Sequence, residues 1–202
     1  MSPKPLSFRV VFSTPWFSVE ESIPERPGEL PYYRMTGPDG VICWPFTVSG
    51  DILLIRQYRP NLDRFTMELP AGSIDGHETI IEAAAREIRE ETGHACGDLG
   101  LLAPGRLHLN RGTHIEHLVL AFDARPIEQA VVEAGIEPVI VTRADFRKMV
   151  QEDRIEQVVA LSFLGLAAAK LGVDMLQDPI DLIHERMRDE VERGNRDGRQ
   201  QD

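Results

Sequence analysis

The sequence predicts an α/β protein, and three observations support this prediction. Short β-prone runs separated by turn residues occupy the opening part of the chain. A capped amphipathic helix is predicted between Thr79 and Gly93. Two further helical segments, 144–151 and 155–171, follow in the last third. The 202 residues, of which 42% are apolar, suffice for one domain with a real core and an extension.

The N-terminal segment is predicted to be β-structure. Residues 7–12 form a short β-prone run, residues 16–21 alternate in polarity, and residues 32–36 lead into a strong turn signal, Gly-Pro-Asp-Gly at 37–40. A strand over 41–48 is expected to follow this turn.

A central strand is predicted over residues 51–58, DILLIRQY. This dense apolar run is bounded by a Ser-Gly turn and by Pro60, as a buried strand should be. Later strands are predicted over residues 99–102, 117–122 and 139–142.

The C-terminal third is predicted to be helical. The stretch VVALSFLGLAAA within 155–171 is almost entirely apolar, so we expect it to be buried against the sheet or at a dimer contact. An amphipathic helix over 178–191 is predicted next. Beyond Gly194 the polar tail NRDGRQQD is predicted to be disordered.

The helix after residue 79 has clear boundaries in the sequence. Thr79 and Glu82 form a capping box, and Gly93 lies where a helix usually ends. Apolar residues recur at helical spacing and are expected to face the core: Ile81, Ala84, Ala85 and Ile88.

Three carboxylates crowd one side of this helix. Glu87 and Glu91 are one turn apart with Glu90 between them, and like charges at this spacing repel unless a cation lies among them. Magnesium prefers oxygen ligands and typically uses one or two carboxylates together with substrate phosphates. The alternative is a solvated acidic face on which Arg86 and Arg89 pair with neighbouring glutamates.

The stretch 72–94, GSIDGHETIIEAAAREIREETGH, resembles the signature of the Nudix hydrolases. The specified places are filled by Gly72, Glu78, Arg86, Glu87, Ile88, Glu90, Glu91 and Gly93. Only His94 departs from the pattern, where an aliphatic residue is usual. The resemblance implies an α/β/α sandwich with a mixed β-sheet, and catalysis that depends on Mg²⁺, with Mn²⁺ as the alternative.

Two further strings, QYRP and ELPAG, resemble the ADP-ribose pyrophosphatase branch of this family. The resemblance implies that Arg59 reaches a substrate phosphate, a role that suits the guanidinium fork. It also implies that Glu68 lies at the metal cluster and that the Ala71 carbonyl is a metal ligand. The alternative for Arg59 is a surface ion pair with Asp63 or Glu68.

For the helix itself, the resemblance implies a division of roles. Glu87 and Glu91 hold metal with the Ala71 carbonyl, aided by Glu90 and Glu68. Arg86 orients Glu87 or its neighbours.

The N-terminal β-segment is similar to the extra sheet of the same branch, which commonly exchanges with its twin in a homodimer. Related enzymes hold an adenine between tryptophans, so Trp16 and Trp44 are candidates for stacking on a base. The alternative is that both tryptophans are dimer or core packing.

The resemblance weakens after the signature. ADP-ribose-specific enzymes carry a proline in a Pro-Gly loop that ends in a glutamate, and Pro104 comes too early for that place. Aligned on Gly112, the pattern Gly-x-x-x-Glu is met by Glu116, but Arg111 stands where the proline belongs. We expect Arg111 to hold a second phosphate or a ribose-linked group.

The general base is expected in the acidic connection 125–137. Related enzymes place a glutamate there, and in our register its place is Ala134, with Glu133 adjacent. Glu133 is therefore the first candidate and Glu116 the second.

Composition excludes several classes. A net charge of -11 argues against nucleic-acid binding, because a phosphate backbone needs a basic face. Cys43 and Cys96 show neither metal-ligand spacing nor a disulfide framework, and we see no membrane span or signal peptide, so a cytoplasmic protein is expected. His114 and His117 would point to opposite sides of a strand, which disfavours a zinc site with His108.

We therefore predict an N-terminal β extension over residues 1–46, a Nudix domain over 47–175, and a C-terminal helix and tail over 176–202. The predicted activity is Mg²⁺-dependent hydrolysis of a nucleoside diphosphate sugar, first ADP-ribose, to AMP and ribose 5-phosphate. The alternatives are another sugar nucleotide, a dinucleotide cofactor or a nucleoside triphosphate as substrate, or a non-catalytic ligand-sensing module.

Overall fold

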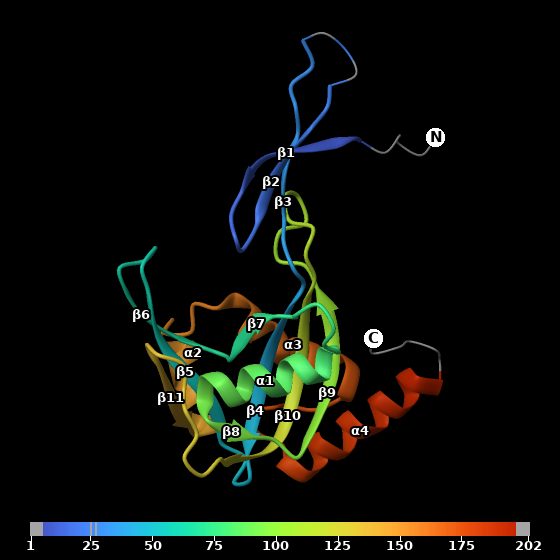
Figure 1. Ribbon diagram of the computed structural model, residues 1–202. Coiled ribbons are helices and arrows are strands. Elements are labelled where there is room, and N and C mark those ends of the chain that lie inside the picture. The colour runs from blue at the N-terminus through green and yellow to red at the C-terminus, as the bar shows by residue number, and fades with distance from the viewer. Residues whose placement is uncertain (1–5, 25, 27, 197–202) are drawn as a thin grey trace.

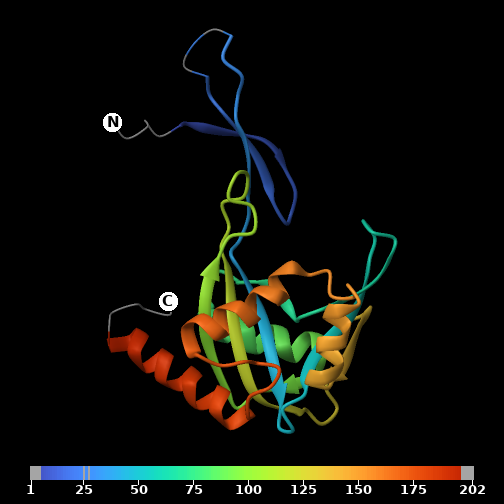
Figure 2. The same cartoon turned by 180° about the vertical axis from the view of Figure 1, so that it is seen from behind.

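The computed structural model describes residues 6–24, 26 and 28–196. The described residues form two β-sheets and four helices (Figure 1). The smaller sheet is antiparallel and contains β1 (Phe8–Ser13), β2 (Ser18–Ser22) and β3 (Tyr33–Thr36) in that order. It projects from one end of the body of the molecule (Figures 1 and 2).

The larger sheet has eight strands and is mixed. Its order is β11-β5-β4-β10-β8, with β6 on β5, β7 on β4 and β9 on β10; β4 and β10 run parallel and the other pairs run antiparallel. The bounds are β4 Gly40–Thr47, β5 Ile52–Arg59, β6 Arg64–Glu68, β7 Ala71–Ser73, β8 His94–Ala95, β9 Asp98–Gly105, β10 Glu116–Pro126 and β11 Ile136–Val141.

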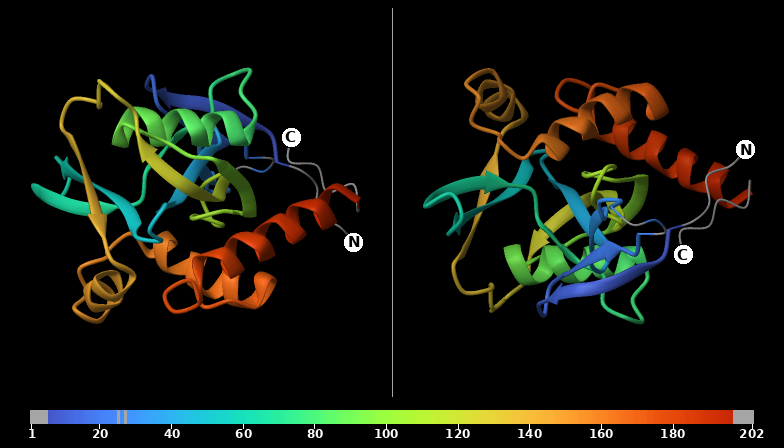
Figure 3. Two further views of the ribbon diagram at one scale, coloured as in Figure 1. Left: turned by 90° about the horizontal axis from the view of Figure 1, so that it is seen from below. Right: turned by 90° about the horizontal axis from the view of Figure 1, so that it is seen from above.

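Helices cover both faces of this sheet. Helix α1 (Ile80–Thr92) lies on one face, and α2 (Arg143–Gln151), α3 (Val158–Leu171) and α4 (Ile180–Arg196) lie on the other (Figure 3). This is the predicted α/β/α sandwich with a mixed sheet.

Two hydrophobic clusters follow from the alternation of side chains along β4, which is buried throughout. Val41 and Cys43 face α1, whereas Ile42, Trp44 and Phe46 face the helices on the opposite side. A strand buried on both faces must be apolar at nearly every position, as this one is.

The predicted strands and helices are present, with ends shifted by a few residues. Strands β6, β7 and β8 were not predicted from the sequence. Strands β7 and β8 have only three and two residues, too few to mark a strand, whereas β6, RFTME, does alternate in polarity and could have been found. No helix among the described residues is long and apolar enough to span a membrane.

Two predicted boundaries need correction. The extension was expected to end at residue 46, but that position lies inside β4, which pairs with β10 in the main sheet. The separation between the sheets falls instead at residues 37–39, the irregular connection between β3 and β4, where the sequence had indicated a turn. Helix α4 runs through Arg196, so the tail is helical for two residues beyond Gly194; residues 197–202 lie outside the described part of the chain.

Candidate active site

Helix α1 begins and ends where the sequence predicts. The Thr79 hydroxyl accepts a hydrogen bond from the Glu82 backbone N–H at 3.2 Å, and the Glu82 carboxylate accepts one from the Thr79 N–H at 2.8 Å. Gly93 ends the helix with φ of 68°, a left-handed conformation that glycine adopts without strain. These caps fix the rotational phase of every side chain between them.

Two glutamates of α1 point toward the inside of the protein. Glu87 and Glu91 are only 8% and 6% exposed. Ala85, expected in the core, is exposed, and Ala83 is buried in its place. The buried arc is therefore rotated toward the carboxylates, because their side chains reach β7 rather than solvent.

Gly72 makes room for Glu87. A Cβ atom on Gly72 would lie 2.0 Å from Glu87 Oε1, well inside contact distance. Gly72 belongs to β7, which pairs with β4 and is thereby held against the sheet. The glycine at this place in the signature thus has a direct steric reason.

Arg86 connects α1 to the β7 loop. Its guanidinium donates to Glu78 at 2.7 and 2.8 Å and to the Ser73 carbonyl at 2.8 Å. It also donates to Glu87 at 2.7 Å and to Glu90 at 3.4 Å. Arg86 therefore contacts Glu87, as its predicted role of orienting that carboxylate would require. The Ser73 carbonyl was not expected as a partner, since no side-chain pattern reports it.

Glu91 is held from the opposite side. Its Oε2 accepts a hydrogen bond from the Ala71 N–H at 2.9 Å. Burial raises the pKa of Glu91 to about 8, and burial also raises the pKa of Glu87, where Arg86 offsets part of the effect. Without a cation, Glu91 thus retains its proton toward neutral pH.

These donors fit a hard divalent cation. The carboxylates of Glu87 and Glu91 and the carbonyl of Ala71 are oxygen ligands of the kind that Mg²⁺ and Mn²⁺ prefer. Across the described ranges, no three His, Cys, Asp or Glu side chains are already assembled as a metal cage. In general, Mg²⁺ binds one or two protein carboxylates together with several waters and substrate phosphate oxygens.

Glu68 pairs with Arg59 in a two-pronged ion pair, at 2.8 and 2.5 Å. Burial alone would raise the pKa of Glu68, but hydrogen bonds from Arg59 and Thr66 outweigh it and lower the pKa below its usual value. The alternative of an Arg59–Glu68 pair is therefore present in this structure, whereas Asp63 bonds to Tyr58.

Of the two base candidates, Glu133 interacts electrostatically with Glu87 and Glu91. Its backbone N–H donates to the Glu90 carbonyl at 2.8 Å, and its negative charge contributes to the raised pKa values of Glu87 and Glu91. Glu133 is exposed to solvent, as a group that exchanges protons must be.

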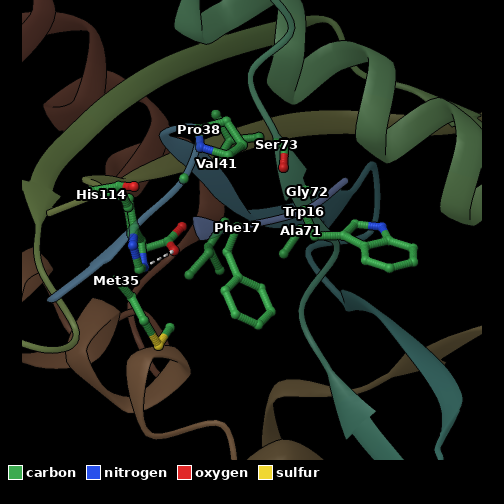
Figure 4. A pocket seen from close by; sticks show the side chains of 14 residues that line it. Trp16, Phe17, Met35, Pro38, Val41, Ala71, Gly72, Ser73 and His114 are labelled. Atoms are coloured by element: carbon green, nitrogen blue, oxygen red, sulfur yellow. Dashed lines mark ion pairs between the residues drawn. The ribbon is translucent and has the colours of Figure 1, made fainter. Parts of the chain in front are cut away.

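Glu116 lines a separate cavity of about 310 Å³ beside β7 (Figure 4). Its wall combines Trp16 and Phe17 from the β1–β2 connection with residues 71–73. His114 Nε2 lies 3.6 Å from Glu116 Oε1. Burial raises the pKa of Glu116, and His114 partly offsets this. Trp16 is 76% exposed, so its ring is free to stack on a ligand.

Trp44 is a correction to the predicted base-binding pair. It is 0% exposed and packs against Phe146 and Phe163, with ring centroids 5.0 and 5.5 Å apart. No face of the indole is left for a base, so the core-packing alternative holds for Trp44. The sequence could have indicated that Trp44 is buried, because it lies in an apolar strand and shares one face with Ile42 and Phe46.

Arg111 is not brought to the carboxylates. Its guanidinium donates to the Tyr33 carbonyl at 2.8 Å and lies 4.1 Å from the centre of the Tyr32 ring. The loop that carries Arg111 thus packs against the small sheet, a long-range contact that no local pattern encodes.

Comparisons with known proteins agree with this geometry. Residues 37–160 match the family model of the NUDIX domain. An ADP-ribose pyrophosphatase of Bacillus subtilis is 27% identical over 138 residues, which cover 65% of this chain and 75% of that protein. An uncharacterized Nudix hydrolase of Schizosaccharomyces pombe is 44% identical over 50 residues, and the match spans only 24% of its length.

A solved structure shares the fold. The crystal structure of an ADP compounds hydrolase superposes with a TM-score of 0.69 at 24% identity, covering 85% of this chain and 97% of that one. The ADP compounds hydrolase NudE of Escherichia coli is 35% identical over 69 residues, or 34% of this chain and 37% of that protein.

Proposed function

Because the chain belongs to the Nudix family, we propose that it is a Mg²⁺-dependent pyrophosphohydrolase of nucleoside diphosphate sugars, with ADP-ribose as the first substrate. The products would be AMP and ribose 5-phosphate. The name of the Bacillus subtilis relative, an ADP-ribose pyrophosphatase, supports this substrate.

The observation that carries the proposal is the burial of Glu87 and Glu91 against β7. Burying two adjacent carboxylates is costly unless a cation or protons compensate them. A solvated acidic helix face, the alternative interpretation, would leave both side chains in water. A divalent cation that a diphosphate also binds accounts for their position.

The chemistry divides between the cation and the chain. When bound, the cation would neutralise charge on the pyrophosphate and lower the pKa of a water. Glu133 is our first candidate to accept the proton of that water, with Glu116 second. The water oxygen bonds to phosphorus, the bridging P–O bond breaks, and the departing phosphate takes the bonding electron pair.

Arg59 and Trp16 are the proposed substrate contacts. Arg59, on β5, forms an ion pair with Glu68 of β6. Its guanidinium can release this carboxylate and bind phosphate oxygens instead. Trp16 lines the cavity next to residues 71–73, where its exposed ring can stack on the adenine.

We also propose a homodimer formed through the small sheet. This sheet and its connections expose large apolar side chains, which a monomer would leave in water: Val10, Val11, Phe12, Trp16 and Leu30. Replacing Phe12 with lysine should therefore shift the sedimentation coefficient toward that of a monomer. A cytoplasmic location and the absence of nucleic-acid partners remain predictions from composition.

The deciding experiment is an assay of the purified protein with Mg²⁺ and ADP-ribose, followed by phosphorus NMR. The pyrophosphate resonances should be replaced by those of two phosphate monoesters. A panel with other sugar nucleotides, dinucleotide cofactors and nucleoside triphosphates ranks the substrate classes. Binding of ADP-ribose without release of a monophosphate from any compound would favour the sensing module.

A further inference from the structure

Gln157 directly precedes α3, yet its side chain serves another element. N-cap residues usually accept hydrogen bonds from their own helix, a role for which Ser, Thr, Asp and Asn are preferred. Gln157 makes no such bond. Its Oε1 instead accepts a hydrogen bond from the backbone N–H of Leu69, 2.9 Å away and 88 positions earlier in the sequence.

Leu69 belongs to the segment that links β6 to β7 and carries two proposed metal groups, Glu68 and the Ala71 carbonyl. Three different elements hold successive backbone groups of this segment. Gln157 binds the Leu69 N–H, the Cys43 N–H of β4 donates to the Pro70 carbonyl at 2.8 Å, and Glu91 of α1 accepts from the Ala71 N–H.

These three bonds differ in what a metal would do to them. Glu91 is itself a proposed ligand, so its bond to the Ala71 N–H competes with coordination. The bond from Gln157 does not involve a metal ligand and can persist when the cation binds. Gln157 also lines the cavity that contains Arg59 and Glu68.

We propose that Gln157 is a positioning residue, which fixes the 68–71 segment so that the Ala71 carbonyl and Glu68 keep their places at the cation. This inference rests on the proposed function for its link to turnover. Removing a residue that holds metal ligands in place typically changes metal affinity or activity by roughly 10–100-fold.

The test compares Gln157→Met, which keeps the length of the side chain but removes the acceptor, with Gln157→Glu, which retains an acceptor. Ser162→Ala is the matched control, because Ser162 lies further along α3, is exposed, and donates to the Val159 carbonyl of its own helix. Mn²⁺ binding without substrate, followed by electron paramagnetic resonance, and steady-state kinetics with Mg²⁺ are measured for each variant.

We expect Gln157→Met to weaken Mn²⁺ binding and lower kcat by about 10–100-fold, with less than a threefold change in KM. Gln157→Glu should recover at least part of both losses, and Ser162→Ala should match the wild type. If Gln157→Met lowers only the melting temperature, leaving Mn²⁺ affinity and kcat unchanged, Gln157 is a structural residue and the inference is wrong. A wild type without hydrolase activity would refute the proposed function, while the Mn²⁺ titration would still test Gln157.

Discussion

The carboxylate site on α1 and the small N-terminal sheet are stabilised in opposite ways. Glu87 and Glu91 are enclosed by their own chain, with Arg86 on one side and the Ala71 N–H on the other. The small sheet, by contrast, leaves Phe12 55% and Trp16 76% exposed. We therefore propose that the reaction chemistry is specified within one chain, and that base recognition uses a surface that a second copy covers.

A substitution at Glu91, inside the enclosed carboxylate site, should have the largest effect on activity. Glu91→Gln keeps the shape and can still accept from the Ala71 N–H, but it removes a proposed metal ligand. We expect kcat to fall on the order of 10³-fold while the fold survives. Glu185→Gln, an exposed change on α4, is the control and should retain full activity. A Glu91→Gln enzyme that turns over normally would remove Glu91 from the metal site.

The same enclosed carboxylate should make the stability of the metal-free protein depend on pH. The pKa of Glu91 is about 8 in the folded chain and near 4.5 when unfolded, so the folded state binds the proton more tightly. The stability that this group contributes is therefore fully present below pH 4.5 and is lost as pH rises through 8, by roughly 5 kcal/mol in all. The raised pKa of Glu87 acts with the same sign.

Urea unfolding at several pH values measures this effect. Glu91→Gln should flatten the dependence, and a saturating concentration of Mg²⁺ should do the same, because the cation replaces the proton. A metal-free wild type that gains stability between pH 5 and 8, relative to Glu91→Gln, would contradict the raised pKa.

A substitution at Gly72 tests whether the Glu87 carboxylate must keep its present position. Gly72→Ala places a methyl group against the Glu87 carboxylate, which must then move, so we expect kcat to fall by about 10²-fold, together with a loss of about 1–3 kcal/mol in stability. Gly76→Ala is the matched control, since nothing lies within 4 Å of its added Cβ. Equal kinetics for the two variants would show that Glu87 need not hold its present position.

The features that could be predicted from the sequence are those that local residue patterns encode. The caps at Thr79 and Gly93 are local signals, and with the signature spacing they were enough to predict α1 and its carboxylates. By contrast, the bond from Gln157 to Leu69 and the docking of Arg111 on β3 both join distant segments. Such contacts depend on how the whole chain folds, and local patterns in a single sequence do not reveal them.

The smallest expected effect on activity concerns Trp16, which lies in the exposed N-terminal extension. Trp16→Ala should raise KM for ADP-ribose by about tenfold, because base stacking contributes about 1–3 kcal/mol, while kcat and the melting temperature stay nearly constant. Val48→Ala, at a 50% exposed position between β4 and β5 and away from the small sheet, is the control and should leave KM unchanged. Trp44→Ala should instead lose about 3–5 kcal/mol of stability, because it empties core volume. If Trp16→Ala leaves KM unchanged, the adenine lies elsewhere, and the small sheet serves only to join two copies of the chain.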